Sequence, residues 1–406
     1  MSGVVIIGAG QAGLQIAESL RRGGHSGHIV LLGDESWLPY QRPPLSKKFL
    51  AEDFAAERLY FRPQEQLAKQ DIEFRPGVRV TAIDRAKAEV VLDTGEHIAW
   101  ERLAIATGTR VRPLPVPGAD HPAVCYLRGI DDGLALKSKL AAAARVVVIG
   151  GGFIGLEVAA TAIKSGKAVT VVEAQDRLMA RAVAPVVSTW FADLHRGHGV
   201  DLRLSCGVTA LRPSHPGVAV LLADGSELEA DLVLAGIGVL ANDELAAASG
   251  LACSSGIIVD EFARTSDPRI VAAGDCTVHR NLRYAAPHRL ESVQNAVDQA
   301  KVAAASLLGQ DTPYRELPWF WSDQYEVKLQ MAGLSSDHDE AIVRGSTSDN
   351  AFGVYYFKAG ELVCVDTINK PAEHMLARRL LGLRVPVSPA QARDTTLDLK
   401  TLLPTG

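Results

Sequence analysis

The chain has 406 residues, of which 47% are hydrophobic and 22% charged, and its formal net charge at pH 7 is −5. This length exceeds one ordinary hydrophobic core, so two or three domains are expected. The acidic balance and the lack of a long basic block argue against nucleic acid as the main partner.

The first predicted elements are a strand, a glycine-rich turn, a helix and a second strand. Short β-branched runs at Val4–Ile7 and Ile29–Leu32 predict the strands, and an amphipathic stretch predicts a helix that ends near Arg22. An acidic residue, Asp34, follows the second strand. The turn reads Gly8-Ala9-Gly10-Gln11-Ala12-Gly13. This combination of strand, glycine turn, helix and acid is typical of a dinucleotide-binding β-α-β unit.

The same pattern occurs a second time. Strands are predicted at Val146–Ile149 and Val169–Val172, a helix continues to about Lys164, and the acid is Glu173. The second glycine turn reads Gly150-Gly151-Gly152-Phe153-Ile154-Gly155. Two such units predict two nucleotide sites, or one site and a decayed duplicate.

Each glycine of the two turns has its own expected role. The first permits the tight turn, the second lets the backbone approach a pyrophosphate, and the third lets the helix pack on the sheet. Asp34 and Glu173 are each expected to accept hydrogen bonds from a ribose. Because a carboxylate repels a 2′-phosphate, Glu173 favours NADH over NADPH. Arg177, four residues further on, is the side chain that could oppose this preference.

The rest of the chain predicts a discontinuous first domain. Residues 103–118 and 232–242 each combine a strand with a glycine turn, which indicates hinges where the chain changes domain. The strand expected within residues 265–275 would return to the first domain. Alternating strands and a last helix near 371–381 predict a separate α+β domain at the C-terminus. The expected domains are residues 1–112 together with 242–318, residues 113–241, and residues 319–406.

Cysteines, apolar runs and histidines exclude several classes of protein. The five cysteines lie far apart without a C-x-x-C pair, which favours a reduced, cytoplasmic location. No run of 18 apolar residues is present and the first strand begins near residue 3, so neither a membrane span nor a signal peptide is expected. His195 with His198, and the acidic cluster at 337–340, lack a third metal ligand at the usual spacing. No metal is expected, and both groups are interpreted as solvated surface.

Glu157 lies in a predicted helix that is otherwise apolar. A buried carboxylate without a partner is costly, so a partner or a ligand is expected for it. Lys47, taken alone, could be an ordinary surface or helix-capping lysine.

Four segments carry a resemblance to a known family. They are RPPLSK at 42–47, VVIGGGFIGLEVAATA at 147–162, RLESVQNAVDQAK at 289–301 and WFWSDQY at 319–325, beside ATG at 106–108 and AAGD at 272–275. Together with both glycine turns, they make the chain resemble the two-dinucleotide-binding flavoprotein reductases, and among these the putidaredoxin reductase type of NADH:ferredoxin reductase. The resemblance covers essentially the whole chain. It implies a glutathione-reductase-like α/β fold, with two Rossmann-like dinucleotide-binding domains and an α+β C-terminal domain.

The resemblance also implies cofactors and their sites. FAD is expected in the discontinuous first domain, NADH in residues 113–241, and a [2Fe–2S] ferredoxin as electron acceptor. Lys47 with Pro44 is expected near the flavin ring, Trp321 on its nicotinamide side, and Glu157 at the carboxamide of NADH. The helix that begins near residues 291–292 is expected to direct its N-terminus at the flavin. The residues expected to contact FAD by family position are Ala12, Asp34, Lys47, Val80, Arg128, Asp275 and Val293.

The partners follow from the same resemblance. Lys301 matches a ferredoxin-docking position, and Arg283 and Arg289 could extend that patch. The segment WFWSDQY resembles reductases of cytochrome P-450 monooxygenases more than those of ring-hydroxylating dioxygenases, which remain the alternative. A disulfide reductase would need a redox cysteine after the first glycine turn, and no cysteine precedes Cys125. An apoptosis-inducing-factor-like protein, which binds DNA or partner proteins, would need a basic surface.

Overall fold

The structure is a computed structural model that describes residues 3–281, 284 and 286–404, and the chain divides into two compact units. Each unit is assembled from three segments of the chain. The first unit is Met1–Arg42, Ala55–Arg110 and Val239–Glu316, and the second is Pro43–Phe54, Val111–Gly238 and Leu317–Gly406. The short segment Pro43–Phe54 therefore belongs with the second unit, although the residues on both sides of it belong to the first.

A five-stranded parallel sheet is the centre of the first unit. Its strand order is β19-β7-β1-β2-β3, and all neighbouring strands run parallel. β1 (Val4–Ile7) and β2 (Ile29–Leu32) form where the sequence predicted them, and every residue in both is buried. Complete burial is expected because parallel sheets are covered on both faces. The other strands are β3 (Ile72–Arg75), β7 (Arg102–Ile105) and β19 (Ile270–Ala272).

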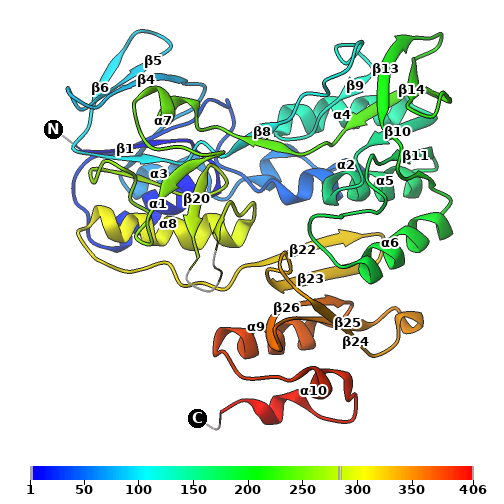
Figure 1. The fold of residues 1–406 in the computed structure, drawn as a ribbon. Helices are drawn as coiled ribbons and strands as arrows, with labels where there is room; N and C mark the ends of the chain where they lie inside the picture. The colour runs from blue at the N-terminus through cyan, green and yellow to red at the C-terminus, as the bar shows by residue number, and fades with distance from the viewer. Residues whose placement is uncertain (1–2, 282–283, 285, 405–406) are drawn as a thin grey trace. The chain divides into compact units, whose positions relative to one another are not determined.

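Helices cover one face of this sheet and a smaller sheet covers the other. α1 (Gln11–Arg22) and α8 (Val293–Leu307) lie side by side (Figure 1) and share a core with Leu31 of β2. The neighbouring Val30 points to the opposite face, where it packs in a core with Val90 of the β4-β5-β6 sheet. The remaining elements are η2 (Ala56–Leu59), α3 (Gln64–Lys69), β4 (Val80–Asp84), β5 (Glu89–Leu92), β6 (His97–Ala99), β8 (Thr109–Val111), β17 (Val239–Ala241), α7 (Glu244–Ala248), β18 (Ile257–Val259), β20 (Thr277–Arg280) and β21 (Pro287–His288).

The second unit contains a parallel sheet of the same kind. The order is β12-β11-β10-β16-β9, with β10 (Arg145–Ile149) between β11 (Ala168–Val172) and β16 (Leu232–Ala235). α5 (Phe153–Lys164) packs on β10 and β11, and the β13-β14-β15 sheet contributes Val218 and Val220 to the core on the sheet. The other elements are η1 (Pro43–Ser46), α2 (Lys48–Ala51), β9 (Val124–Cys125), α4 (Ile130–Ala142), α6 (Pro185–Gly197), β12 (Asp201–Arg203), β13 (Val208–Pro213), β14 (Val218–Leu222) and β15 (Glu227–Ala230).

The C-terminal part of the second unit is an antiparallel sheet with a helix packed on it. The strand order is β22-β23-β26-β25-β24, and α9 (Pro371–Gly382) contacts β23 and β26. Tyr355, Val365 and Leu380 are fully buried between sheet and helix. The other elements are β22 (Trp319–Gln324), β23 (Val327–Gly333), β24 (Glu340–Arg344), η3 (Thr347–Asp349), β25 (Phe352–Lys358), β26 (Glu361–Ile368), α10 (Pro389–Arg393) and η4 (Leu399–Leu402). The α/β fold class and the change to alternating strands after residue 318 are confirmed.

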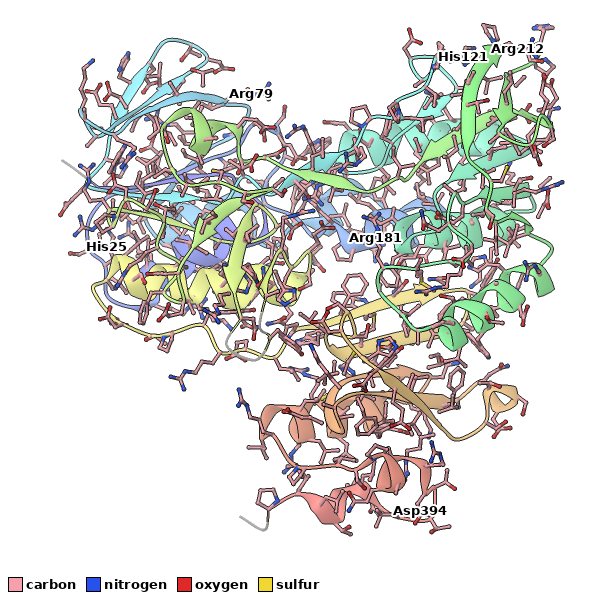
Figure 2. The ribbon with its side chains drawn as sticks, in the orientation of Figure 1. His25, Arg79, His121, Arg181, Arg212 and Asp394 are labelled. Atoms are coloured by element: carbon pink, nitrogen blue, oxygen red, sulfur yellow. The ribbon has the colours of Figure 1, made fainter. Side chains whose placement is uncertain are left out.

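Arg344 ties the last segment of the chain to this sheet. Its guanidinium donates to the backbone carbonyls of Ala392 at 3.1 Å, Asp394 at 2.5 Å and Leu397 at 2.6 Å. Figure 2 labels Asp394 at the end of α10. The bonds to Ala392 and Asp394 satisfy carbonyls at the end of α10, and the bond to Leu397 holds the segment that follows it.

His374 on α9 makes the stability of this part depend on pH. The side chain is 1% exposed, and neither ring nitrogen has a hydrogen-bond partner among the described residues. Burial lowers the pKa of His374 to about 4. The unfolded chain, with a pKa of about 6.5, therefore holds more protons between pH 6.5 and 4, and stability falls as the pH is lowered through that window.

The prediction is that His374→Leu reduces the loss of unfolding free energy between pH 7 and pH 5 by about 2 kcal/mol. The measurement is urea unfolding of wild type and variant at both pH values. Burial raises the pKa of Asp366 to about 7, so this group increases the stability of the folded protein as the pH falls. Its effect is the same in wild type and variant and cancels when their unfolding free energies are compared. Equal pH dependence in the two proteins would show that His374 is not the titrating group.

Candidate functional site

The glycine turn after β1 has the shape that a pyrophosphate requires. Gly8 has φ +105°, and a Cβ added there would lie 2.2 Å from the carbonyl oxygen of Ala106. A Cβ on Gly13 would lie 1.8 Å from the carbonyl oxygen of Gly8, so the helix can approach the strand only without a side chain. Around Gly10, by contrast, no described atom lies within 4 Å of such a Cβ. The open space lies at the N-terminus of α1, where backbone N–H groups favour an anion.

The turn after β10 repeats this geometry. Gly150 also has φ +105°, and its added Cβ would lie 2.4 Å from the carbonyl oxygen of Gly236. The Cβ of an alanine at Gly155 would lie 2.4 Å from the carbonyl oxygen of Gly150, while Gly152 faces open space within the described residues. The tight turn at the first glycine and the close helix packing at the third are therefore found at both turns, and the pyrophosphate contact of the second glycine remains a prediction. Both turns fit the pyrophosphate of a bound dinucleotide.

The carboxyl ends of three strands bring the first site together. β7 pairs with β1, and β19 pairs with β7, all in parallel. The ATG segment follows β7 and the AAGD segment follows the start of β19, so both lie at the edge of the sheet that carries the first glycine turn. Gly274, with φ +87°, comes so close to Ala12 that an added Cβ would lie 3.1 Å from the Cβ of Ala12. The hydroxyl of Thr109 donates to the half-buried carboxylate of Asp275 at 3.5 Å.

Other residues expected to contact FAD lie at defined places in their own unit. Val293 is the first residue of α8, and the Ser292 side chain caps this helix by accepting from the N–H of Asn295 at 3.0 Å, so the predicted helix start is confirmed. Val80 is half-buried at the start of β4. Arg128, in the second unit, lies before α4 and donates its backbone N–H to Asp132 at 2.9 Å. Their contacts with FAD remain predictions.

The two acids differ in position. In each sheet the first glycine donates its N–H to the last strand residue, Gly8 to Leu32 and Gly150 to Val172, so these two residues are equivalent. Glu173 comes directly after Val172, but the equivalent residue after Leu32 is Gly33. Asp34 is therefore one position further along, and its side chain is exposed. Gly33 thus adds one residue between the strand and the acid of the first unit, and the contact of each acid with a ribose remains a prediction.

Glu173 is held at the mouth of the second turn. Its carboxylate accepts the N–H of Gly151 at 2.6 Å and the N–H of Gln175 at 2.8 Å. Arg177 is turned away to the loop that follows, where it donates to the carbonyls of Ala180 at 2.6 Å and Val183 at 2.7 Å. The guanidinium that could have opposed NADH specificity is thus occupied by the protein itself. Arg181, labelled in Figure 2, is exposed on the same loop.

Glu157 is the centre of a buried polar cluster in the second unit. Its side chain is 5% exposed, and its Oε2 accepts the hydroxyl of Ser46 at 2.5 Å and forms an ion pair with Lys47 Nζ at 2.8 Å. Its Oε1 accepts the hydroxyl of Ser322 at 2.7 Å. The expected partner of this carboxylate is therefore found: Lys47, together with two serine hydroxyls. Two charges this poorly hydrated are stable only with their hydrogen bonds satisfied.

Trp321 lies on β22, directly before Ser322 of this cluster. The residue is half-buried, and its ring centre is 5.6 Å from that of Trp319. The role expected for Trp321 at the nicotinamide, like that of Lys47 at the flavin, remains a prediction.

Sequence reasoning missed a set of buried polar residues behind Glu157. His195 was interpreted as solvated surface, which is wrong: its side chain is 0% exposed, and its Nε2 lies 2.8 Å from Oε1 of Gln324. Its ring is buried because α6 turns this face inward, whereas His198, three residues on, is exposed. The sequence of β22 contained an indication of this cluster. Its two buried residues, Ser322 and Gln324, are both polar and are separated by one residue, so they share one face of the strand. The missed residues are the buried Ser46, His195, Ser322 and Gln324 and the half-buried Tyr325.

The cysteines offer no redox thiol. All five lie in the described part of the chain and are free rather than paired. Cys276, next to Asp275, is fully buried, and burial raises the pKa of its thiol to about 11. At neutral pH this side chain is a thiol, which is a poor nucleophile.

The residues expected to dock a ferredoxin are partly neutralised by their neighbours. Lys301 is exposed on α8 and forms an ion pair with Asp298 at 2.7 Å. Arg289 pairs with Glu291 at 2.6 Å. Arg283 lies outside the described residues.

Neither a membrane-spanning helix nor a metal site is found in the part of the chain that the structure describes. Within it, no helix combines the length and the apolar character that crossing a membrane requires. Nor do three histidine, cysteine, aspartate or glutamate side chains gather anywhere in that part as a metal site.

Comparisons with known proteins agree with this geometry. Residues 2–300 match the family model described as pyridine nucleotide-disulphide oxidoreductase, and residues 319–403 match the one described as reductase C-terminal. Rhodocoxin reductase of Rhodococcus erythropolis is 49% identical over 98% of this chain and 93% of its own length. Putidaredoxin reductase of Pseudomonas putida is 44% identical over 98% and 96%. The crystal structure of the ferredoxin reductase for the CYP199A2 system of Rhodopseudomonas palustris superimposes with a TM-score of 0.96, 44% identity and 99% coverage of both chains.

Proposed function

This chain belongs to the pyridine nucleotide-disulphide oxidoreductase family, and we propose that it is the NADH-dependent ferredoxin reductase of a cytochrome P-450 system. As a relative of putidaredoxin reductase over nearly its full length, the chain is an FAD-dependent NAD(P)H:ferredoxin oxidoreductase. The observation that supports NADH as its donor is the placement of Glu173. Its carboxylate is fixed at the second glycine turn by two backbone N–H groups.

In the proposed reaction the protein binds and orients, and FAD, when bound, supplies the redox chemistry. The N-termini of α1 and α5 bind the pyrophosphates of FAD and NADH. Glu173 accepts from the adenosine ribose of NADH and repels a 2′-phosphate. The Lys47–Glu157 pair, Trp321, and the N-terminus of α8 at Val293 are assigned to the nicotinamide and the flavin. No thiol takes part, which agrees with the buried Cys276.

NADH is expected to reduce the bound flavin much faster than NADPH under anaerobic conditions. In Glu173→Arg this preference should shrink by about 1–3 kcal/mol, the scale of one charged hydrogen bond. The substitution also removes the acceptor of the Gly151 N–H, so NADH itself should bind less tightly. The measurement is stopped-flow flavin bleaching with each nucleotide, compared as a ratio within each protein. Equal rates with both nucleotides in the wild type would refute the assignment of Glu173.

The ferredoxin is proposed to dock near Lys301, with Arg289 and Arg283 extending the patch. Because electron-transfer complexes must form and separate quickly, recognition should come from complementary charge. Lys301→Glu would then raise the apparent KM for a [2Fe–2S] ferredoxin by about three- to tenfold at low salt and flatten its salt dependence.

Steady-state reduction of a ferredoxin at several salt concentrations tests this. Lys87→Glu makes the same charge change on an exposed residue of the β4-β5 hairpin and is the matched control. Reduction of the flavin by NADH should be unchanged in both variants. Equal ferredoxin KM values for Lys301→Glu and Lys87→Glu would show that the docking site does not include Lys301.

The P-450 assignment rests on the WFWSDQY segment and on the 44% identity to a reductase of the CYP199A2 system. A cytoplasmic location is part of the same proposal, since five unpaired thiols suit a reducing compartment.

A further inference from the structure

We propose that His195, Gln324 and Ser322 form a directed hydrogen-bond chain that fixes the orientation of the Glu157 carboxylate and so positions Lys47. His195 and Gln324 are thereby positioning residues for the reduction of flavin by NADH. The inference rests on the function proposed above, because it concerns that hydride-transfer step. All of its residues lie in the second unit: Glu157 on α5, His195 on α6, Ser322 and Gln324 on β22, and Lys47 between η1 and α2.

The chain is continuous and buried. Ser322 Oγ lies 2.7 Å from Glu157 Oε1, and Gln324 Nε2 lies 3.2 Å from Ser322 Oγ. His195 Nε2 follows at 2.8 Å from Gln324 Oε1, and Tyr325 closes the series with its hydroxyl 3.2 Å from His195 Nδ1. The exposed fractions are 0% for Ser322 and His195 and 1% for Gln324. Water does not compete for these groups, so each must find its partner within the chain.

The donor in every link follows from the first. Ser322 has a single proton, and a carboxylate oxygen at 2.7 Å can only accept it. Ser322 Oγ must then accept from Gln324, whose only donor is Nε2, so the amide oxygen faces His195. His195 must therefore carry its proton on Nε2, which leaves Nδ1 to accept from Tyr325. Each of the four groups thus donates toward Glu157.

This arrangement transmits orientation and not a proton. The Gln324 amide accepts at oxygen and donates at nitrogen, so a proton received at one atom has no direct route to the other. His195 also has the charge state that the chain requires. Burial lowers the pKa of His195 to about 4, so at pH 7 the ring is neutral and Nδ1 is an acceptor.

The same bonds fix the strand that carries Trp321. Side chains alternate along β22, so Ser322 and Gln324 share one face, and Trp321 lies on the other. Phe320 also contacts α5, with its ring centre 4.8 Å from that of Phe153. The register of β22 itself is held by its backbone pairing with β23, so a loosened chain would release the carboxylate and the side-chain packing of β22 against α5. Misplacement of this kind acts on the reaction rate rather than on nucleotide binding.

Gln324→Leu breaks the middle of the chain with a side chain of similar size. The rate constant for flavin reduction at saturating NADH is expected to fall about tenfold, whereas the Kd for NADH stays within about twofold. Ser322→Ala should behave alike, and Ser322→Thr, which keeps the hydroxyl, should restore most of the rate. Thr367→Val is the matched control, because it removes a buried hydroxyl of the same antiparallel sheet that donates to the Gln330 carbonyl. A wild-type rate in Gln324→Leu, or a weakened Kd with an unchanged rate, would overturn the proposal.

A second measurement does not depend on turnover. In holoenzyme labelled with ¹⁵N-histidine, NMR should show His195 at pH 7 protonated on Nε2 and unprotonated on Nδ1. A proton on Nδ1 would reverse the chain and overturn the inference, even if Gln324→Leu fails to fold. If the wild-type flavin is not reduced by NADH, the proposed function fails instead, and the His195 tautomer still decides whether the chain exists.

Discussion

Glu157→Leu is expected to slow reduction of the bound flavin by NADH about a hundredfold, the scale set by loss of precise positioning. The carboxylate holds Lys47 Nζ at 2.8 Å and accepts two serine hydroxyls, so its removal leaves an ammonium and two O–H groups without their acceptor. FAD should remain bound, because the first glycine turn lies in the other unit. Stopped-flow bleaching by NADH, followed by oxidation of the dithionite-reduced enzyme with ferredoxin, separates the two half-reactions.

Only the NADH half-reaction should suffer in Glu157→Leu. Lys164→Ala on the same helix is the control, because it removes an exposed ion pair with Glu326 that should contribute little. Adding Lys47→Met should bring the melting temperature back toward that of the wild type, since no uncompensated charge then remains. If Glu157→Leu were reduced by NADH at the wild-type rate, neither Glu157 nor the hydrogen-bond chain of Ser322, Gln324 and His195 would have a role in hydride transfer.

Alanine at the third glycine of each turn is expected to separate the two cofactors. In Gly13→Ala the new Cβ would lie 1.8 Å from the Gly8 carbonyl oxygen, so α1 must move away from β1 and the protein should be purified without FAD. In Gly155→Ala the distance to the Gly150 carbonyl oxygen would be 2.4 Å. That variant should stay yellow and be reduced by dithionite, while the KM for NADH rises at least about tenfold.

Absorbance spectra of the purified proteins and NADH titrations measure these effects. Gly197→Ala, at the exposed end of α6 where no described atom lies within 4 Å of the added Cβ, controls for the substitution itself. Loss of FAD in Gly155→Ala with retention in Gly13→Ala would reverse the assignment of the two sites.

The glycine turns could be predicted because their physical constraint is local. A residue with φ +105° and a carbonyl where its Cβ would lie has to be glycine, so Gly8 and Gly150 mark the site in the sequence itself. Both acids follow their strands as predicted, Glu173 directly and Asp34 after one intervening residue, Gly33.

The polar chain behind Glu157 could not be predicted in the same way. His195 and Gln324 are 129 positions apart in the sequence, and their contact depends on how α6 packs beside β22. The apolar residues Val187 and Phe191, eight and four positions before His195, place it on the buried face of α6, but they do not identify its partner. The alternation of Ser322 and Gln324 indicated a polar strand face, but not the partner that this face would meet.

The segment Pro43–Phe54 affects the order in which the protein can be completed during synthesis. Phe49 is fully buried and packs over Gly133 of α4, where an added Cβ would lie 2.9 Å from its ring, and Ser46 binds Glu157 across 111 positions. The ribosome therefore makes this part of the second unit well before the helices it covers. A fragment that begins at Val111 would lack it and leave the pocket of Phe49 open to solvent. The second unit therefore contains residues made early and late in translation, and the C-terminal part of the chain alone lacks one of its buried side chains, Phe49.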